Sequence, residues 1–312
     1  MLSHTKAKHA NAFDQLIMDE KIDAEFFIDE PASKHTTYSC GGPFKHFAVA
    51  NTISSLQQIM RTCKECNVET FLIGKGSNLL VADSGFDGMV VSLGIDFRHT
   101  KLDEKTNTII AGAGVSFAKV SQLAYTNNLS GLEFSVGIPG TVGGALGMNA
   151  GTEGVGLCDV VSSVSILDKR DNYSLKKLTK QDFEFGYHAS SISKRGIALE
   201  CEIPLKPAKT RDLQVTMEEK LKRRNASQPI GHNCGSVFKN PEGESAGKLI
   251  EDCGLKGKKI GGAEISTLHA NFIPNVDDAK AQDVMDLILL AQDEVLKKFG
   301  VKLEPEVKFL GF

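Results

Sequence analysis

A glycine-rich segment that is also apolar most constrains what this 312-residue chain can fold into. Residues 131–156 contain nine glycines, and Phe134, Val136, Ile138 and Leu146 stand among them. Flexible linkers combine glycine with serine, so this composition is not typical of a linker. Glycine beside apolar residues indicates a buried backbone that passes close to a neighbour or adopts a positive φ. Bare amide groups in such turns bind anions, and a diphosphate is the natural ligand.

A second glycine loop, residues 74–80 with the sequence GKGSNLL, follows a short β-prone run at 70–73. Leu79 takes the place of the third glycine in the dinucleotide fingerprint G-x-G-x-x-G, and the loop lacks the Lys-Ser/Thr ending of a P-loop. Taken alone, this loop is better explained as a tight turn. Two glycine loops of neither familiar type predict a different nucleotide-binding fold.

Helical and strand-like periodicities interleave without a regular βα alternation, which predicts an α+β fold and not a doubly wound sheet. Helices are expected at 53–66, 116–127, 210–224, 246–253 and 277–299. Strands are expected at 70–73, 89–93, 108–111, 160–167, 173–178, 197–205 and 306–310.

The charge and the apolar pattern exclude several classes of partner. With 36 basic and 39 acidic residues, the formal net charge is -3, so no global positive field attracts nucleic acid or anionic lipid. No segment approaches the roughly 20 apolar residues of a membrane span. Residues 1–30 lack the continuous apolar stretch of a secretory signal. We therefore expect a cytoplasmic protein with no nucleic-acid or membrane partner.

The seven cysteines are odd in number and widely spaced, which fits reduced thiols in a cytosol. Cys63 and Cys66 form a C-x-x-C pattern. A zinc site needs a second ligand pair nearby, and a redox motif belongs at the start of a helix. This pattern ends an amphipathic run, so packing is the favoured interpretation and no metal is expected.

Short motifs follow one another in order from about Thr36 to Gly311. They are GGP at 41–43, GKGSNLL at 74–80, GLEF at 131–134, GIPGTVGG at 137–144, MNAG at 148–151, GSVFKNP at 235–241, AGKLIE at 246–251, HANFI at 269–273 and EPEV at 304–307. Any one of them could arise by chance. Together, in this order, they resemble the bacterial UDP-N-acetylenolpyruvoylglucosamine reductase (MurB) family, flavoenzymes of peptidoglycan precursor synthesis.

The resemblance implies an α+β fold with a flavin-binding half of two α+β subdomains (the vanillyl-alcohol-oxidase or PCMH type) and a C-terminal α+β substrate-binding domain. The expected parts are an N-terminal extension at 1–30, a first FAD-binding subdomain at 31–94 with the C-terminal strand 304–312, a second at 95–208, and the substrate domain at 209–303. The direct connection from Gly186-Tyr187 to the helix at Thr210 resembles the shorter, type II form of the family.

The family reduces an enolpyruvyl ether on a UDP-sugar to a lactyl ether. The resemblance therefore implies non-covalent FAD, NADPH as reductant, a UDP-sugar substrate, and a monomer acting in cell-wall biogenesis. Backbone N–H groups of residues 76–79 and 140–144 are expected to hold the FAD pyrophosphate. The full set of expected FAD-binding residues is Gly74, Gly76, Ser77, Asn78, Leu79, Gly137, Ile138, Pro139, Gly140, Thr141, Gly143, Gly144, Asn149 and Ala150.

Two residues match the family's catalytic positions. Ser236 matches the proton donor, although a serine in a Gly-Ser turn is unremarkable by itself. Glu306 matches the catalytic glutamate, which polarises the enol system as an acid or anchors a water. The resemblance also implies substrate binding by Tyr187, Lys239, Asn240 and Lys308, the last standing where many members carry arginine.

One departure concerns the arginine that usually follows the tyrosine of Phe-Gly-Tyr-Arg and binds the substrate carboxylate. Here the residue is His188, a third expected catalytic residue. An imidazole carries positive charge only when protonated. One hypothesis is that His188 replaces the arginine and activity falls as pH rises. The other is that Lys194, Arg195 or another cation does so.

Two further interpretations stay open from the sequence. The chain could be another flavin oxidoreductase of the same fold, although no histidine or cysteine that could tether flavin lies within 131–156. It could also be a non-catalytic UDP-sugar-binding relative, but such a protein has no chemical need for Ser236 and Glu306.

Overall fold

The computed structural model describes residues 13, 15–17, 19 and 21–312, and they form two compact units. Unit 1 comprises the described residues up to 28 together with 46–74 and 88–220, and unit 2 comprises residues 29–45, 75–87 and 221–312. Each unit has its own apolar core. The domain bounds expected from the resemblance stay a prediction. Of the expected extension at 1–30, residues 1–12, 14, 18 and 20 lie outside the described residues.

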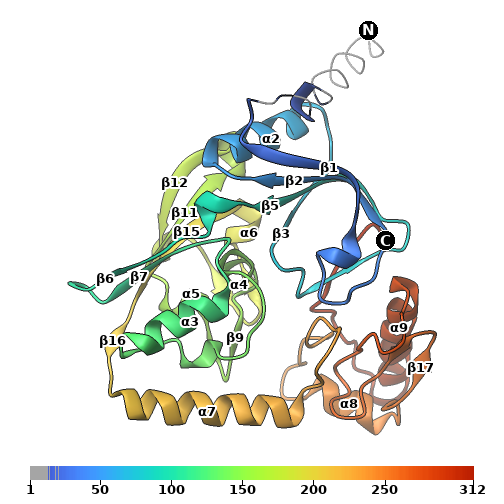
Figure 1. Ribbon diagram of the computed structural model, residues 1–312. Coiled ribbons are helices and arrows are strands. Elements are labelled where there is room, and N and C mark those ends of the chain that lie inside the picture. Colours follow the sequence, from blue (N-terminus) through green and yellow to red (C-terminus); the bar gives the residue numbers. More distant parts are fainter. Residues whose placement is uncertain (1–12, 14, 18, 20) are drawn as a thin grey trace. The chain divides into compact units, whose positions relative to one another are not determined.

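Unit 1 is built around a five-stranded antiparallel sheet with the strand order β12-β11-β15-β7-β6 (Figure 1). Its strands are β6 (Thr100–Asp103), β7 (Thr108–Gly112), β11 (Ser163–Asp168), β12 (Ser174–Thr179) and β15 (Gly196–Pro204). The helices α3 (Phe117–Thr126) and α4 (Val142–Met148) pack against this sheet. The glycine-rich segment thus lies on the apolar core and not in an exposed linker.

A second sheet has the strand order β1-β2-β5-β3. It comprises β1 (Ala24–Pro31), β2 (Pro43–Ala50), β5 (Phe86–Leu93) and β3 (Thr70–Ile73), with β3 parallel to β5. The helix α2 (Ile53–Glu65) begins at a Thr52–Ser55 capping box, and its apolar face enters the core of unit 1. Such reciprocal side-chain bonds satisfy two of the amide groups at a helix start.

Unit 2 contains α8 (Ala246–Asp252) and α9 (Ala281–Phe299), which pack on each other. The last strand, β19 (Lys308–Leu310), runs parallel to β4 (Leu79–Val81), with Lys308 opposite Leu79. The end of the chain is therefore hydrogen-bonded to the strand that follows the first glycine loop.

Other elements are short strand pairs and helices. The strand pairs are β8 (Leu129–Ser130) with β16 (Lys206–Pro207), β9 (Gly151–Thr152) with β10 (Val155–Gly156), β13 (Phe185–Gly186) with β14 (Ala189–Ser190), and β17 (Lys259–Ile260) with β18 (Ala263–Glu264). The helices are α5 (Leu157–Val160), α6 (Ile192–Arg195) and α7 (Thr210–Ser227). No helix among residues 13, 15–17, 19 and 21–312 has the length and apolar character that crossing a bilayer requires.

The structure confirms the predicted α+β class and places an element within each predicted range, although several bounds differ. The strand expected at 306–310 begins at Lys308, so Glu306 lies just before it. Residues 157–160 form a helix, so the strand expected at 160–167 begins at Ser163. The helix expected at 277–299 begins at Ala281. The Asp83 carboxylate accepts hydrogen bonds from the N–H groups of Ala281 and Gln282 at 2.9 and 3.0 Å, which fixes that start from a distant loop.

The C-x-x-C pattern lies at the end of α2. Cys63 is fully buried in the core, and Cys66 follows as the C-cap residue. Burial raises the pKa of the Cys63 thiol to about 12, which keeps it protonated and unreactive at neutral pH. Cys63 is therefore a packing residue.

Candidate functional site

Two segments of unit 2 that are distant in sequence pair with each other and carry the expected catalytic residues. The N–H of Glu306 donates to the carbonyl of Val237 at 2.8 Å, and the N–H of Lys239 donates to the carbonyl of Glu304 at 3.0 Å. Because Ser236 directly precedes Val237, this pairing brings the backbones of Ser236 and Glu306 to the same place. The motifs at 235–241 and 304–307 are thus paired with each other in the fold.

Asn271, which the sequence did not single out, stabilises the first of these paired segments. Asn271 is buried, and its side-chain amide accepts from the N–H of Phe238 at 2.9 Å and donates to the carbonyl of Phe238 at 2.8 Å. Its backbone carbonyl accepts from the N–H of Val237 at 2.8 Å. The only sequence signal was its place in the HANFI motif.

The carboxyl group of Glu306 is partly buried. Burial raises its pKa from 4.5 to about 7, although the positive charges of Lys239 and Lys308 act in the opposite direction. Desolvation disfavours the charged carboxylate. A substantial fraction of Glu306 therefore carries a proton at neutral pH and can donate a hydrogen bond.

Ser236 is partly exposed, whereas the thiol two residues before it is buried. The Cys234 thiol lies 3.2 Å from the hydroxyl of Tyr38, which is fully buried. Burial raises the pKa of Cys234 to about 12, so the thiol stays protonated. Ser236 therefore offers the accessible hydroxyl of this turn.

Two of the other expected substrate residues of unit 2, Lys239 and Asn240, already have protein partners. The Lys239 ammonium group forms an ion pair with Glu304 at 2.5 Å. The side-chain oxygen of Asn240 accepts from the N–H of Ala246 at 3.0 Å, at the start of α8. Lys308 is exposed. An anionic ligand that binds Lys239 has to share the ammonium group with Glu304 or displace Glu304 from it.

The first glycine loop contacts the segment that carries Glu306, which directly precedes β19. The side-chain amide of Asn78 donates to the carbonyl of Glu306 at 3.0 Å, and the N–H of Lys308 donates to the carbonyl of Asn78 at 3.0 Å. The loop residue expected to bind FAD is thus also a support for the catalytic segment.

An unsatisfied hydroxyl lies beside the same loop. Thr36 is buried, and among the described residues its hydroxyl oxygen has no hydrogen-bond partner. A Cβ atom added to Gly76 would lie 2.7 Å from the Thr36 Cα, so the two backbones touch. Buried polar groups are almost always satisfied. A polar ligand in this loop would satisfy the orphaned hydroxyl, which fits the FAD that the resemblance implies.

In unit 1 the first glycine loop begins against the second. A Cβ atom at Gly74 would lie 2.5 Å from the side-chain oxygen of Thr141, so only glycine fits there. Thr141 caps α4 by accepting from the N–H of Gly144 at 3.3 Å. The N–H groups of Val142 and Gly143 donate to the carbonyls of Val115 and Ala113, respectively.

These bonds reduce the number of N–H groups in the second glycine loop that can bind a pyrophosphate. Three N–H groups of the stretch 140–144 already have protein acceptors, so those of Gly140 and Thr141 are the candidate donors to a pyrophosphate. The preceding residues 137–140 form a loop with positive φ at Gly137 and Gly140. Ile138 packs against the core and Ala150 bonds to Ala145, so both hold the loop's shape.

Tyr187 and His188 form the two-residue turn between β13 and β14. Gly186 pairs with Ala189 across this hairpin. The Tyr187 side chain is 58% exposed, and its ring centroid lies 4.2 Å from that of His188. The backbone of His188 has a φ of 47°. The two expected substrate residues thus lie together at an exposed turn.

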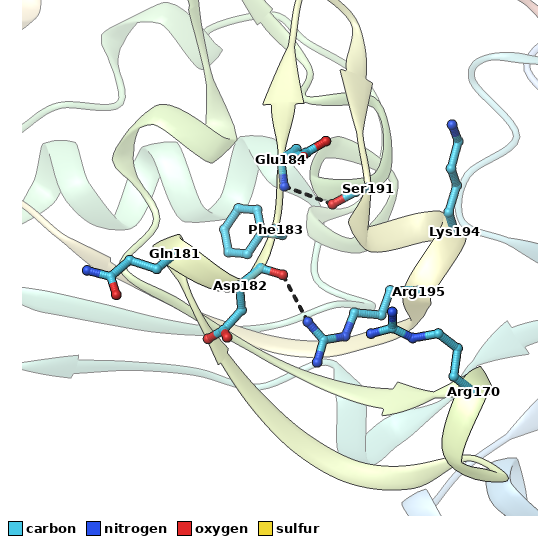
Figure 2. A pocket seen from close by; sticks show the side chains of 8 residues that line it. All are labelled: Arg170, Gln181, Asp182, Phe183, Glu184, Ser191, Lys194 and Arg195. Atoms are coloured by element: carbon cyan, nitrogen blue, oxygen red, sulfur yellow. Dashed lines mark hydrogen bonds between the residues drawn. The ribbon is translucent and has the colours of Figure 1, made fainter.

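A pocket of about 410 Å³ lies at the base of this hairpin (Figure 2). Its lining residues are Arg170, Gln181, Asp182, Phe183, Glu184, Ser191, Lys194 and Arg195. Arg195 donates to the carbonyl of Asp182 at 2.9 Å and lies 3.4 Å from the Asp168 carboxylate. Lys194 points away from the two arginines in Figure 2. Arg195 is therefore engaged in holding the hairpin base, which weakens it as a replacement for the missing arginine.

Comparison with known proteins shows where this architecture belongs. Residues 44–172 match an FAD binding domain, and residues 226–310 match the C-terminal domain of UDP-N-acetylenolpyruvoylglucosamine reductase. The cofactor prediction of FAD is thereby confirmed.

Whole-chain relatives agree. A UDP-N-acetylenolpyruvoylglucosamine reductase of Alkaliphilus oremlandii (strain OhILAs) is 42% identical over 286 residues, which is 91% of this chain and 93% of the relative. One from Limosilactobacillus reuteri subsp. reuteri (strain JCM 1112) is 39% identical over 95% of this chain and 98% of the relative. The crystal structure of the Thermus caldophilus reductase (MurB) superposes with a TM-score of 0.79 at 32% identity, covering 92% of this chain and 98% of that one. The chain belongs to the UDP-N-acetylenolpyruvoylglucosamine reductase family.

Proposed function

We propose that this protein reduces the enolpyruvyl ether of a UDP-N-acetylglucosamine substrate to the lactyl ether, UDP-N-acetylmuramate, with NADPH as the reductant. Family membership supports the reaction class, since the named relatives are reductases of this type. The structural observation that carries the proposal is the pairing of the Ser236 and Glu306 segments in unit 2. When bound, FAD supplies hydride transfer from NADPH to the terminal enol carbon.

Hydride addition to that carbon leaves negative charge on the neighbouring carbon and its carboxylate. The Ser236 hydroxyl donates a proton to the neighbouring carbon, which completes the addition of one hydride and one proton across the double bond. Ser236 then recovers a proton from solvent. Glu306, with a pKa of about 7, donates a hydrogen bond toward the enol system in its protonated form.

The binding roles are also proposals. Gly74, Gly140, Thr141 and residues 76–79 hold the FAD, with Thr36 as an additional hydroxyl donor. Lys239 offers positive charge to the diphosphate, and Tyr187 and His188 bind the sugar end of the substrate. The orphaned Thr36 hydroxyl and the close approach of Gly74 to Thr141 support the FAD assignment.

We further propose a cytoplasmic monomer. The seven cysteines are odd in number and widely spaced, which supports a reducing compartment. Light scattering on the purified FAD-loaded protein tests the monomer directly, and a dimer mass would contradict it.

The deciding experiment is anaerobic. NADPH is expected to bleach the flavin band near 450 nm, a general flavin property, and the enolpyruvyl UDP-sugar is expected to restore it. In Ser236→Ala, bleaching is expected to be unchanged, while product formation falls at least about 100-fold. If the reduced flavin is reoxidised when air is admitted but not by the UDP-sugar, the result would favour an oxidase. Full product formation by Ser236→Ala would remove Ser236 from its role.

A further inference from the structure

We propose that Asn149 is a positioning residue for this reaction: its side-chain amide holds the Tyr187–His188 turn to the end of the glycine helix α4. The inference rests on the proposed function, because that function makes the turn part of the substrate site. All of the residues involved lie in unit 1.

Asn149 ends α4 in the left-handed region, with φ 46° and ψ 51°. Asparagine adopts this conformation more readily than most residues, which makes it a suitable helix-ending residue. Its side chain is only 7% exposed. The helix end therefore turns the amide group inward.

Both ends of the amide are engaged. The Nδ2 group donates to the carbonyl of Gly186 at 2.9 Å, and Oδ1 accepts from the N–H of Cys158 at 2.9 Å. A Cβ atom at Gly156 would lie 2.3 Å from Oδ1, so the chain closes tightly around this oxygen. The donor and the acceptor face groups of opposite kind, which fixes the orientation of the amide.

The hairpin that receives this bond is too short to order itself. Strands β13 and β14 pair over two residue positions only, and an isolated two-stranded hairpin is marginally stable in water. At its base, Glu184 and Ser191 exchange hydrogen bonds of 2.8 and 2.9 Å. Gly186 directly precedes Tyr187, so the Asn149 bond is an anchor at the tip.

The Asn149 bond therefore fixes the position of the Tyr187–His188 turn relative to the glycine segment. Without the anchor, the hairpin keeps its base bonds, but the directions of the Tyr187 and His188 rings are no longer fixed. Pre-organised positions lower the entropy lost on binding. Loss of the anchor is therefore expected to lower the rate of the step that uses the UDP-sugar. The rate of flavin reduction is expected to stay the same.

The variant Asn149→Asp isolates the anchor. Aspartate tolerates the left-handed conformation and keeps an acceptor for the Cys158 N–H, but it sets an oxygen against the Gly186 carbonyl. Asn149→Gly removes both bonds without backbone strain. The matched control is Asp159→Ala, because Asp159 accepts from the N–H of Gly156 at 2.7 Å and supports the same loop without touching the hairpin.

For both Asn149 variants, kcat/KM for the enolpyruvyl UDP-sugar is expected to fall about tenfold or more, because both lose the buried hydrogen bond to the Gly186 carbonyl. FAD affinity and the rate of bleaching by NADPH are expected to stay at the wild-type values. In Asp159→Ala, thermal stability falls and kcat/KM for the UDP-sugar does not change.

A second measurement is independent of activity. The chain has no tryptophan, so Tyr187→Trp introduces a single fluorescent reporter at the turn. In this background, Asn149→Asp is expected to lower the tryptophan anisotropy of the FAD-loaded protein, and Asp159→Ala is not.

Unchanged anisotropy together with unchanged kcat/KM in Asn149→Asp would overturn the inference. So would a loss of FAD affinity at constant kcat/KM, which would make Asn149 a flavin contact only. Failure of the proposed function looks different, since the wild-type flavin would then not be reoxidised by the UDP-sugar, and the anisotropy would still decide the role of Asn149.

Discussion

The side-chain amide of Asn271 satisfies both main-chain polar groups of Phe238, at 2.9 Å and 2.8 Å. It does for this residue what a neighbouring strand does in a sheet. Since Phe238 follows Ser236 by two positions, the bond pair fixes the backbone that carries the proposed proton donor.

Asn271→Ala is expected to destabilise the protein by about 2–4 kcal/mol, because two buried main-chain groups of Phe238 lose their partners. Thermal unfolding measures the loss. The control is Asn51→Ala, which removes an exposed amide bond to Asp23 of 3.0 Å. Its expected cost is below about 1 kcal/mol. Equal losses in the two variants would contradict the role of Asn271.

Glu306→Gln is expected to change how stability depends on pH. The pKa of Glu306 is raised in the folded protein from 4.5 to about 7, so the folded state binds more protons than the unfolded state between these values. Its contribution to stability is therefore greatest below pH 4.5 and is lost as pH rises to about 7. The loss is at most about 3 kcal/mol.

The variant has no carboxyl group to charge, so its melting temperature should approach that of the wild type at pH 5 and exceed it at pH 8. A constant difference between the two proteins across this range would show that Glu306 titrates normally. The same variant is expected to lower kcat, because an amide N–H is a weaker hydrogen-bond donor than the protonated carboxyl group.

His188→Arg tests which cation serves the substrate carboxylate. An imidazole ordinarily loses its proton near pH 6.5, whereas a guanidinium stays charged. If both His188 and Glu306 must be protonated, wild-type kcat/KM falls with two protons lost above neutral pH, and the arginine variant falls with only one. Lys194→Ala is the control and should keep the wild-type profile. A large loss of kcat/KM at every pH in that control would instead assign the cation role to Lys194, because an ammonium group ordinarily stays charged through this range.

Much of the fold followed from periodicity. The apolar spacing along residues 53–66 and 281–299 marks α2 and α9, because their buried faces repeat at helical intervals. The glycine helix α4 was not predicted, since glycine disfavours helix and the segment is ordered by packing on the sheet. The start of α9 depends on Asp83, almost 200 positions earlier in the chain, and no local pattern reveals such a cap.

The residues of the candidate site also divide into those that the sequence predicted and those that only the structure reveals. Ser236 and Glu306 were found through short motifs and not through their chemistry, since a turn serine and a terminal glutamate are common. The structure adds the pairing through Val237, which sequence separation hides. Thr36 and Asn271 were missed because what distinguishes them, an orphaned hydroxyl and a doubly bonded amide, exists only once the chain has folded.

The contact of Gly74 with Thr141 gives the sharpest test of the flavin loops. An alanine Cβ at position 74 would lie 2.5 Å from the Thr141 side-chain oxygen, so the loop or the cap of α4 has to shift. Overpacking of this kind typically costs about 1–3 kcal/mol. FAD affinity is therefore expected to fall about tenfold or more, read as the flavin content of purified protein and by titration of apoprotein.

Gly147→Ala is the matched control within the same glycine segment. Its Cβ would lie 3.5 Å from that of Ser193, which is ordinary contact, and alanine favours helix over glycine. This variant should bind FAD as the wild type does and melt at the same or a higher temperature. If Gly74→Ala also kept full flavin content, the first glycine loop would not be a flavin cradle, because a displaced loop cannot keep its amide groups on the pyrophosphate.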